Sequence, residues 1–367
     1  MKANRIYKNS GFTIVEMMIS LVLGALLLGG IISLFTNNQQ TYRIIQGTAN
    51  LQDNARFAID VISEDIRMSG YYGCLSNSAA PVYNPSLLNT GSNIDFLFQN
   101  LSLGLEAFEA TNVTTWQPAL PALLTVDLPA LNRPPPQGGT DVVAIKRVIS
   151  NGVTLNSLND PTKTMQVEGT GSFAQNDAAI ISDCEKATLF QVTAANDSGT
   201  NQNIEYKTTG ATPGNINAPI STGASYVASS SSVYQFASAV YYIAPAWDTT
   251  NNQAVTNNRG DQVLSLWRIQ GINTAGQPVP EELLRGVENL QVVYGVDSNP
   301  APPNEGDNTI DQYLNANQVD AIANGFERVI TARIDLTVNS IDSIGTQNDG
   351  VLRRTFSHTV KLRNRGS

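Results

Sequence analysis

One apolar segment close to the N-terminus constrains the fold more than any other feature of this sequence. Residues 12–35, FTIVEMMISLVLGALLLGGIISLF, are apolar apart from Glu16 and a few small residues that carry hydroxyl groups. As an α-helix rising about 1.5 Å per residue, this segment would cross a hydrocarbon core of about 30 Å. We therefore expect a single membrane-spanning helix, with the rest of the chain on one side of the membrane.

The residues before this segment predict its orientation and its processing. Residues 1–11 carry three cations and no acid, so this end is expected to stay in the cytoplasm and the chain after residue 36 to be exported. A secretory signal has its small-residue cleavage motif after the apolar region, whereas here the small residue, Gly11, precedes it. Cleavage between Gly11 and Phe12 would keep the helix as a permanent anchor and leave a free amine on Phe12.

Glu16 is the ionisable residue within the apolar segment. A charge one turn into a membrane helix costs a few kcal/mol unless it has a partner. The residues alone allow two interpretations. Either the carboxylate reaches the interface and water, or it pairs with a new α-amino group on the neighbouring subunit of a helical bundle.

The order of cations, glycine, phenylalanine, glutamate and apolar run resembles the class III leader of type IV pilins and pseudopilins, with G-F-T-I-V-E at residues 11–16. The resemblance implies that prepilin peptidase cleaves after Gly11 and N-methylates Phe12. It also implies that Glu16, the fifth mature residue, pairs during assembly. This sequence departs from many major pilins because no proline occurs before Pro81.

The helix is expected to continue beyond the membrane and then give way to strands. Within residues 37–69 an apolar stripe recurs at helical spacing on one face, as Leu51, Ala55, Ala58, Ile62 and Ile66. We expect this face to pack on the chain's own domain and Gly70 to end the helix. The expected organisation is a leader peptide at 1–11, a transmembrane and assembly helix at 12–36, its amphipathic continuation at 37–69, and a β-rich extracytoplasmic domain at 70–367.

Alternating runs rich in Val, Ile, Tyr and Thr predict the strands of this domain. These runs are Asp141–Ile149, Ala178–Cys184, Thr188–Thr193, Ser231–Ala244, Val263–Ile269, Leu290–Val296, Arg328–Val338 and Arg353–Arg363. The long polar stretches 76–140, 194–230 and 297–312 are expected to be surface insertions, and Glu281–Gly286 a short helical turn. The predicted fold is α+β and pilin-like, a long N-terminal helix packed on an antiparallel β-sheet body with long loops.

Cysteine and histidine usage bears on compartment and chemistry. In an exported protein the two cysteines, Cys74 and Cys184, are expected to form a disulfide; two buried thiols are the alternative. The single histidine, His358, argues against His-based zinc sites and against Ser–His or Cys–His catalysis. Since P-loop, G-x-G-x-x-G and G-x-S-x-G motifs are also lacking, an envelope enzyme has no supporting constellation. No enzymatic activity and no cofactor are expected.

The charge balance disfavours nucleic-acid binding. Loss of the leader cations, Lys2, Arg5 and Lys8, would take the formal net charge from −9 to −12, and an acidic body is poorly suited to gripping phosphate backbones.

Three further groups of residues have both a functional and a structural interpretation. The acidic loop of Asp297, Asn304, Glu305, Asp307 and Asp311 offers oxygen ligands for calcium, but its spacing does not fit an EF-hand, so a solvated loop is favoured and no metal is expected. Asp183 and Glu185 are expected to be surface charges. Trp116, Trp247 and Trp267 suit core packing better than a receptor- or glycan-binding patch.

Three internal segments narrow the resemblance to the PilW family of type IV pilus minor pilins. They are R-M-S-G-Y-Y-G-C at 67–74, L-L-R-G-V-E-N-L-Q-V-V-Y-G-V-D at 283–297 and F-S-H-T-V-K-L-R-N at 356–364. The family implies a role in starting pilus assembly at or near the fibre tip, in support of twitching motility and adhesion. The implied partners are other minor pilins, the major pilin, prepilin peptidase and a tip adhesin. The implied location is the inner membrane, with the C-terminal domain periplasmic, and then the extracellular fibre.

Two alternatives remain open from the sequence. A type II secretion pseudopilin shares the leader and the general fold, and neighbouring genes would separate it from a pilus protein. A dedicated pilus-tip adhesin would lose adhesion but keep piliation when the loop between residues 76 and 140 is deleted.

Overall fold

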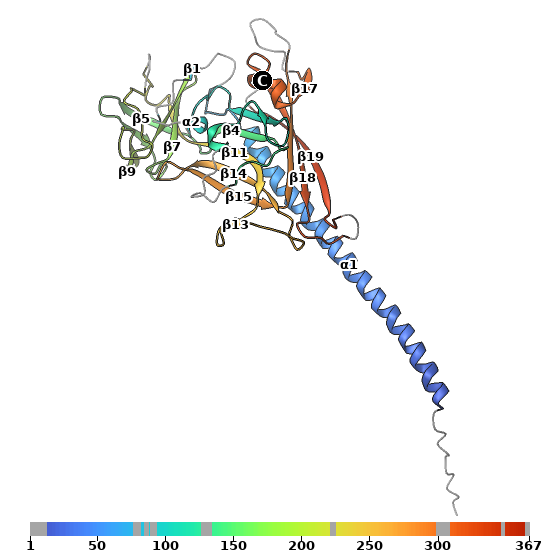
Figure 1. The fold of residues 1–367 in the computed structure, drawn as a ribbon. Coiled ribbons are helices and arrows are strands. Elements are labelled where there is room, and N and C mark those ends of the chain that lie inside the picture. The colour runs from blue at the N-terminus through green and yellow to red at the C-terminus, as the bar shows by residue number, and fades with distance from the viewer. Residues whose placement is uncertain are drawn as a thin grey trace, which may run out of the picture.

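The chain consists of one long helix that projects from a β-rich body (Figure 1). The structure is a computed structural model, and it describes residues 13–75, 82–83, 88, 94–125, 134–220, 225–298, 309–345 and 349–363. Gly11 and Phe12 lie outside the described residues. Helix α1 (Ile14–Arg67) runs without a break for 54 residues, which corresponds to about 80 Å of helix.

The two halves of α1 have opposite environments. Large apolar side chains between Ile14 and Phe35 keep 54–80% of their surface exposed. The predicted stripe in the second half is confirmed, since Leu51, Ala55, Ala58, Ile62 and Ile66 are all at most 3% exposed. The first half therefore lacks a covering surface within the described chain, while the second half is part of the protein core.

A tight backbone contact fastens the end of α1 to the body. The helix ends at Arg67, three residues before the Gly70 that was expected to end it. Gly70 has a φ of +69°, and its N–H donates to the carbonyl of Lys146 at 2.9 Å. A Cβ on Gly104 would lie 2.6 Å from Gly70 Cα, so these two backbones approach as only glycines allow.

The body contains many short elements, labelled in Figure 1. The strands are β1 (Val82–Tyr83), β2 (Leu105–Ala110), β3 (Trp116–Gln117), β4 (Val142–Val148), β5 (Val153–Asn159), β6 (Thr164–Glu168), β7 (Ala178–Ser182), β8 (Lys186–Gln191), β9 (Ala194–Ser198), β10 (Asn201–Glu205), β11 (Ser232–Pro245), β12 (Trp247–Asp248), β13 (Gln253–Ala254), β14 (Leu264–Ile272), β15 (Pro278–Arg285), β16 (Val287–Val296), β17 (Gln312–Leu314), β18 (Val329–Asn339) and β19 (Arg353–Lys361). The short helices are α2 (Asp95–Phe98), α3 (Ala122–Thr125), α4 (Ala316–Asp320) and a 3-10 turn at Gly325–Arg328.

Strand β11 organises the larger of the two main sheets. This sheet has 13 strands, and the 14-residue β11 pairs with β5 and β7 at its start, with β4 along its middle and with β14 along its second half. The second sheet has the order β17-β16-β18-β19. Every pair in the two sheets is antiparallel except β1 with β8. The predicted α+β fold of a long helix on an antiparallel body is therefore confirmed.

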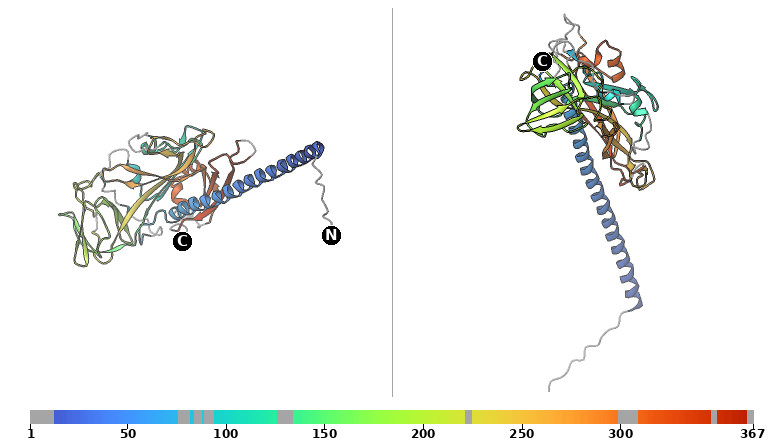
Figure 2. Two further views of the ribbon diagram at one scale, coloured as in Figure 1. Left: turned by 90° about the horizontal axis from the view of Figure 1, so that it is seen from below. Right: turned by 90° about the vertical axis from the view of Figure 1, so that its left-hand side faces the viewer.

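The described part of the body contains three apolar cores. The first lies between α1, the four-stranded sheet and one face of β4, β11 and β14. The second covers the opposite face of those strands under residues 94–125. The third belongs to β5 through β10, which we call the inserted lobe because it is inserted between β4 and β11. The lobe lies on the side of the body away from the four-stranded sheet (Figures 1 and 2).

Each of the eight predicted strands overlaps an observed one, but the prediction for Glu281–Gly286 was wrong. These residues were expected to form a helical turn, and instead residues 281–285 belong to β15, which pairs with β14. The segment is rich in helix formers, yet β14 offers an open ladder of backbone partners, and tertiary pairing overrides local propensity. The chain then bends at Gly286, whose φ is +80°, between β15 and β16.

The polar stretches 76–140 and 194–230 are not simply surface insertions. The second contains β9 and β10, and the first contains β2, β3, α2 and α3. Buried core side chains come from the first stretch, among them Leu97, Leu105 and Leu124 at 0% exposure. Deleting residues 76–140 would remove part of the core, so this deletion cannot separate adhesion from folding.

Candidate functional site

The N-terminal end of α1 forms a capping box around the candidate assembly residue. Thr13 is the N-cap, and its hydroxyl accepts from the Glu16 N–H at 3.3 Å. The Glu16 carboxylate returns to accept from the Thr13 N–H and hydroxyl, each at 3.0 Å. This reciprocal pair satisfies backbone N–H groups that a helix start otherwise leaves open. The box holds the carboxylate beside the residue that follows Phe12.

The apolar half of α1 meets the length and composition of a membrane-crossing helix. Within Ile14–Arg67 an 18-residue window has a mean hydropathy of 2.5 and is 0% buried. Gly24, Gly29 and Gly30 have nothing within 4 Å of a Cβ built on them. The whole segment is thus open to lipid or to other helices on every side.

A polar cluster fixes the second half of α1 to the central strands. Asp65, 5% exposed on α1, accepts from the Arg147 guanidinium at 2.8 Å and from the Tyr241 hydroxyl at 2.6 Å. Burial, and then the charge of Asp65, raise the pKa of Tyr241, so the hydroxyl stays protonated and donates. The cluster therefore joins α1 to β4 and β11 through charge-assisted bonds.

The sequence did not predict this cluster. Arg147 and Tyr241 are 82 and 176 residues away from Asp65 in the chain, so no local pattern links them. One signal was present: Asp65 follows Ile62 by three residues and directly precedes Ile66, which puts a carboxylate at the margin of an apolar stripe. A buried carboxylate there requires a cationic or hydrogen-bonding partner.

Cys74 and Cys184 form a disulfide, with Cα atoms 4.9 Å apart. Cys74 lies seven residues beyond the end of α1, and Cys184 lies in the turn between β7 and β8. Both cysteines are exposed. The bond links the end of the long helix to the large sheet without contributing to an apolar core.

The other candidate residues have structural surroundings. Asp183 accepts from the N–H groups of Glu185 and Lys186 at 2.9 and 2.8 Å and so closes the β7–β8 turn. The packing interpretation of the tryptophans is confirmed: Trp267 is buried in the second core, and Trp116 and Trp247 pack against it.

Part of the candidate calcium loop lies outside the described residues, namely Asn304, Glu305 and Asp307. The Asp311 carboxylate accepts from the N–H and hydroxyl of Ser298 at 2.8 and 3.1 Å. Asp297 is 5% exposed, and its N–H donates to the carbonyl of Arg328 at 3.1 Å. That this loop is solvated and holds no metal stays a prediction.

Asp141 is a buried carboxyl group at the junction of the two main sheets. It is 2% exposed, and its two oxygens accept from the N–H groups of Ala110 at 3.1 Å and Val292 at 2.9 Å. Burial raises the pKa of Asp141 to about 7; the charge of Glu109 adds to the rise, and the two N–H donors oppose it. The side chain joins β2 to β16, and it keeps its proton at pH values well above those at which an aspartate usually ionises.

The contribution of Asp141 to the stability of the protein should therefore fall as the pH rises from about 4 to about 7 and level off above that. In this window folded Asp141 holds a proton that the unfolded chain releases, because its pKa is about 7 in the fold and about 4 when unfolded. A group with a raised acidic pKa stabilises most below its unfolded pKa and loses that contribution as the pH passes the folded value. Thermal unfolding of Asp141→Asn across this range should show a flatter slope, whatever its absolute stability. An unchanged slope would contradict the assignment.

Two models of known protein families match parts of this chain. Residues 6–32 match the family model described as the prokaryotic N-terminal methylation motif, and residues 241–349 match the one described as type IV pilus-assembly protein W. The second match runs from the second half of β11 through β18, strands that contribute to the core around α1. No significant match was found among curated proteins or among solved structures. These two matches make the chain similar to prepilin-type proteins at its N-terminus and to type IV pilus-assembly protein W over residues 241–349.

Proposed function

We propose that the chain is a minor pilin that starts assembly of a type IV pilus at or near the fibre tip, and that it thereby supports twitching motility and adhesion. It performs no catalytic step of its own. Before assembly it spans the inner membrane once, with the β-rich body in the periplasm. It then enters the extracellular fibre beside other minor pilins and the major pilin.

The observation that carries this proposal is the continuity of α1. Side chains from Ile14 to Phe35 expose their apolar surface, and the same unbroken helix is buried in the body from Leu51 to Ile66. The free energy of an apolar helix changes little when it exchanges lipid tails for the apolar faces of other helices, because both environments are equally non-polar. A stiff helix shared by anchor and body can thus pass from membrane to fibre without refolding of the body.

Processing would complete the N-terminal end of this helix. Cleavage after Gly11 leaves the amine of Phe12, which we propose is N-methylated by prepilin peptidase, one residue before Thr13. The Glu16 carboxylate already contacts the Thr13 N–H at 3.0 Å, at the positive end of the helix dipole. We propose that this carboxylate exchanges its Thr13 contacts for the amine of a neighbouring subunit during assembly.

Deletion of the gene in strains with and without pilus retraction tests the proposed function. An initiation role predicts few surface pili and no twitching in the deletion strain, and many more pili when retraction is also disabled. The match to a pilus-assembly family favours this role over a type II secretion pseudopilin. Normal piliation in the deletion strain, with a defect in protein secretion, would reverse that preference.

Glu16→Val should reproduce the deletion phenotype although the protein is made and inserted normally. Valine removes the charge that would pair with a subunit amine, and it also makes the membrane segment more apolar. Pili are counted by electron microscopy, with protein level and membrane fractionation measured in parallel. Met17→Val, which changes an exposed neighbour without removing a charge, is the matched control. Pili at normal number with Glu16→Val would show that this pairing is not required.

A further inference from the structure

Strand β19 is an open edge of the four-stranded sheet. It pairs with β18 on one side and is the last strand in the order β17-β16-β18-β19. Of its nine residues, seven are exposed. A long exposed edge is a template for pairing with another chain, so the direction of its backbone groups is decisive.

The hydrogen bonds that flank β19 fix this direction. At one end the Ser340 N–H donates to the Leu352 carbonyl, and at the other the Leu362 N–H donates to the Ile330 carbonyl, both at 2.9 Å. The backbone N–H and C=O groups of the even-numbered residues of β19 therefore point toward β18. Those of the odd-numbered residues point away from β18, toward the open side. These residues are Arg353, Thr355, Ser357, Thr359 and Lys361. Among the described residues no backbone group pairs with them.

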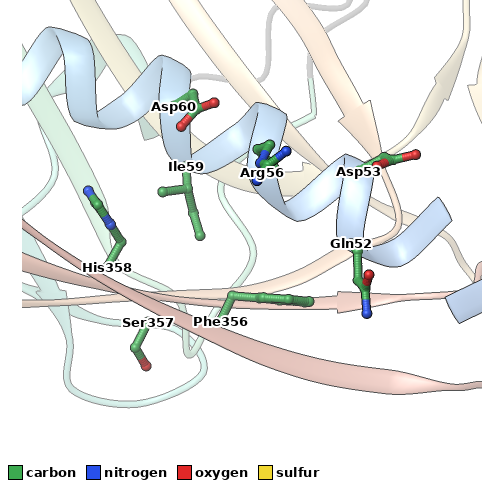
Figure 3. A pocket seen from close by; sticks show the side chains of 8 residues that line it. All are labelled: Gln52, Asp53, Arg56, Ile59, Asp60, Phe356, Ser357 and His358. Carbon is green, nitrogen blue, oxygen red and sulfur yellow. The ribbon is translucent and has the colours of Figure 1, made fainter. Parts of the chain in front are cut away.

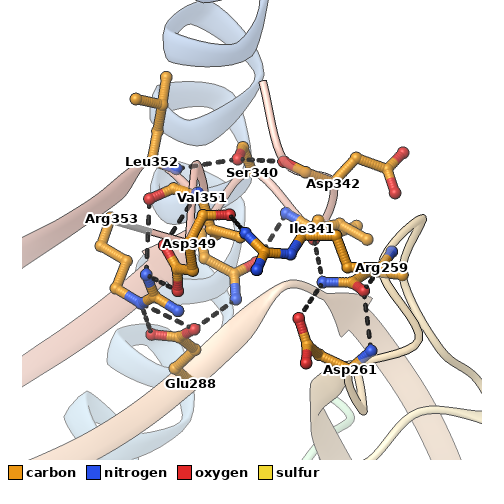
Figure 4. Close-up of polar contacts among 12 residues, drawn as sticks. Arg259, Asp261, Glu288, Ser340, Ile341, Asp342, Asp349, Val351, Leu352 and Arg353 are labelled. Atoms are coloured by element: carbon orange, nitrogen blue, oxygen red, sulfur yellow. Dashed lines mark hydrogen bonds and ion pairs between the residues drawn. The ribbon is translucent and has the colours of Figure 1, made fainter. Parts of the chain in front are cut away.

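Just beyond the strand, one outward-pointing backbone group already has a partner within the protein. The N–H of Arg363, the next odd-numbered residue, donates to the carbonyl of Arg67 at 2.9 Å. The start of the strand is fixed as well, because Arg353 forms ion pairs of 2.7 Å with Glu288 and with Asp349 (Figure 4). The open edge is thus held at both ends, and a partner would not need to order it.

A groove of about 440 Å³ lies beside this edge, between α1 and β19. Phe356 and His358 line it from the strand, and Ile59 from the helix; Ser357 points away (Figure 3). Asp53, Arg56 and Asp60 border the groove with charges of both signs. A strand added to β19 would place every second side chain in this groove and the others on the opposite face of the sheet.

Charge disfavours β19 of a second copy as the occupant in the symmetric antiparallel register. Strand β19 contains Arg353, Arg354 and Lys361 and no acid. If two copies paired in antiparallel register about Ser357, Arg353 of each would face Lys361 of the other. Like charges directly opposite one another destabilise a strand pair, whereas carboxylates at those positions would stabilise it.

We propose that β19 is a docking edge for an extended segment of a different protein, with acidic side chains on one face of the added strand and apolar side chains on the other. The acidic face meets Lys361, and the apolar face enters the groove beside Phe356 and Ile59. Main-chain bonds supply the affinity and the alternate side chains the specificity, as in other cases of strand addition. The proposal does not depend on the role in pilus initiation.

Binding of two synthetic peptides to the full-length protein in detergent tests the proposal. One nine-residue peptide alternates glutamate and valine, the other lysine and valine, and each is labelled for fluorescence anisotropy. The glutamate peptide should bind with a Kd on the order of 100 μM or tighter, and the lysine peptide at least about tenfold more weakly. Equal binding of the two peptides, or no binding of either, would overturn the proposal.

Two variants connect that binding to β19. Ser357→Pro removes an edge-facing N–H that takes no part in pairing with β18, and proline is tolerated at such positions. It should weaken glutamate-peptide binding about tenfold or more, while Ser357→Ala leaves it unchanged. Lys361→Glu should weaken the glutamate peptide and strengthen the lysine peptide, which decides the matter if Ser357→Pro fails to fold. Wild-type binding by folded Ser357→Pro, or no reversal of preference with Lys361→Glu, would refute docking at this edge.

Discussion

Replacing Cys74 and Cys184 together with serine should lower the free energy of unfolding by about 4–5 kcal/mol. The bond joins residues 110 positions apart. In the chain-entropy model, closing a loop of that length restricts the unfolded chain and so stabilises the fold by this amount. Because both cysteines are exposed, serine opens no cavity, and the loss should come almost wholly from the freed unfolded chain.

Denaturant unfolding of the full-length protein in detergent, with and without reductant, measures this effect. The reduced wild-type protein, the single variant Cys184→Ser and the double variant should all lose similar stability, because each lacks the same cross-link. Glu185→Ala, an exposed change in the β7–β8 turn that leaves the bond intact, serves as the control. Equal midpoints for the oxidised and reduced wild-type protein would show that the disulfide does not stabilise the fold.

The sequence predicted the long helix well because each half carries a strong local signal. The length and composition of the apolar run predict an exposed anchor, and the helical spacing from Leu51 to Ile66 predicts the buried stripe. The strand runs were found for the same reason, since alternation of period two survives wherever one face is buried.

What the sequence did not reveal depends on pairing between distant residues. The inserted lobe was partly overlooked because β9 and β10 are built from residues such as Asn196, Asn201 and Asn203, which are depleted in strands generally. Strand β15 was missed since its partner, β14, decides its conformation. The openness of β19 follows from the order of strands in the sheet, and that order cannot be read from local periodicity.

The cluster around Asp65 shows how strongly such distant contacts bear on stability. Asp65→Ala should lower the free energy of unfolding by about 3–5 kcal/mol, because it leaves the Arg147 guanidinium without its buried carboxylate. The side chains of Arg147 and Asp65 are only 19% and 8% exposed, so water replaces little of what is lost. The Tyr241 hydroxyl, which donates to Asp65 at 2.6 Å, loses its acceptor as well.

Two comparisons separate this interaction from general damage to α1. Asp60→Ala, on the same helix but exposed, should change stability by about 0.5 kcal/mol or less. The double variant Asp65→Leu with Arg147→Met should recover a large part of the loss, because it removes both charges together and leaves neither buried alone. Denaturant unfolding measures all of these variants. If Asp65→Ala cost no more than Asp60→Ala, the stripe of apolar side chains alone would hold the helix on the body, and the ion pair would be dispensable for the coupling between anchor and domain.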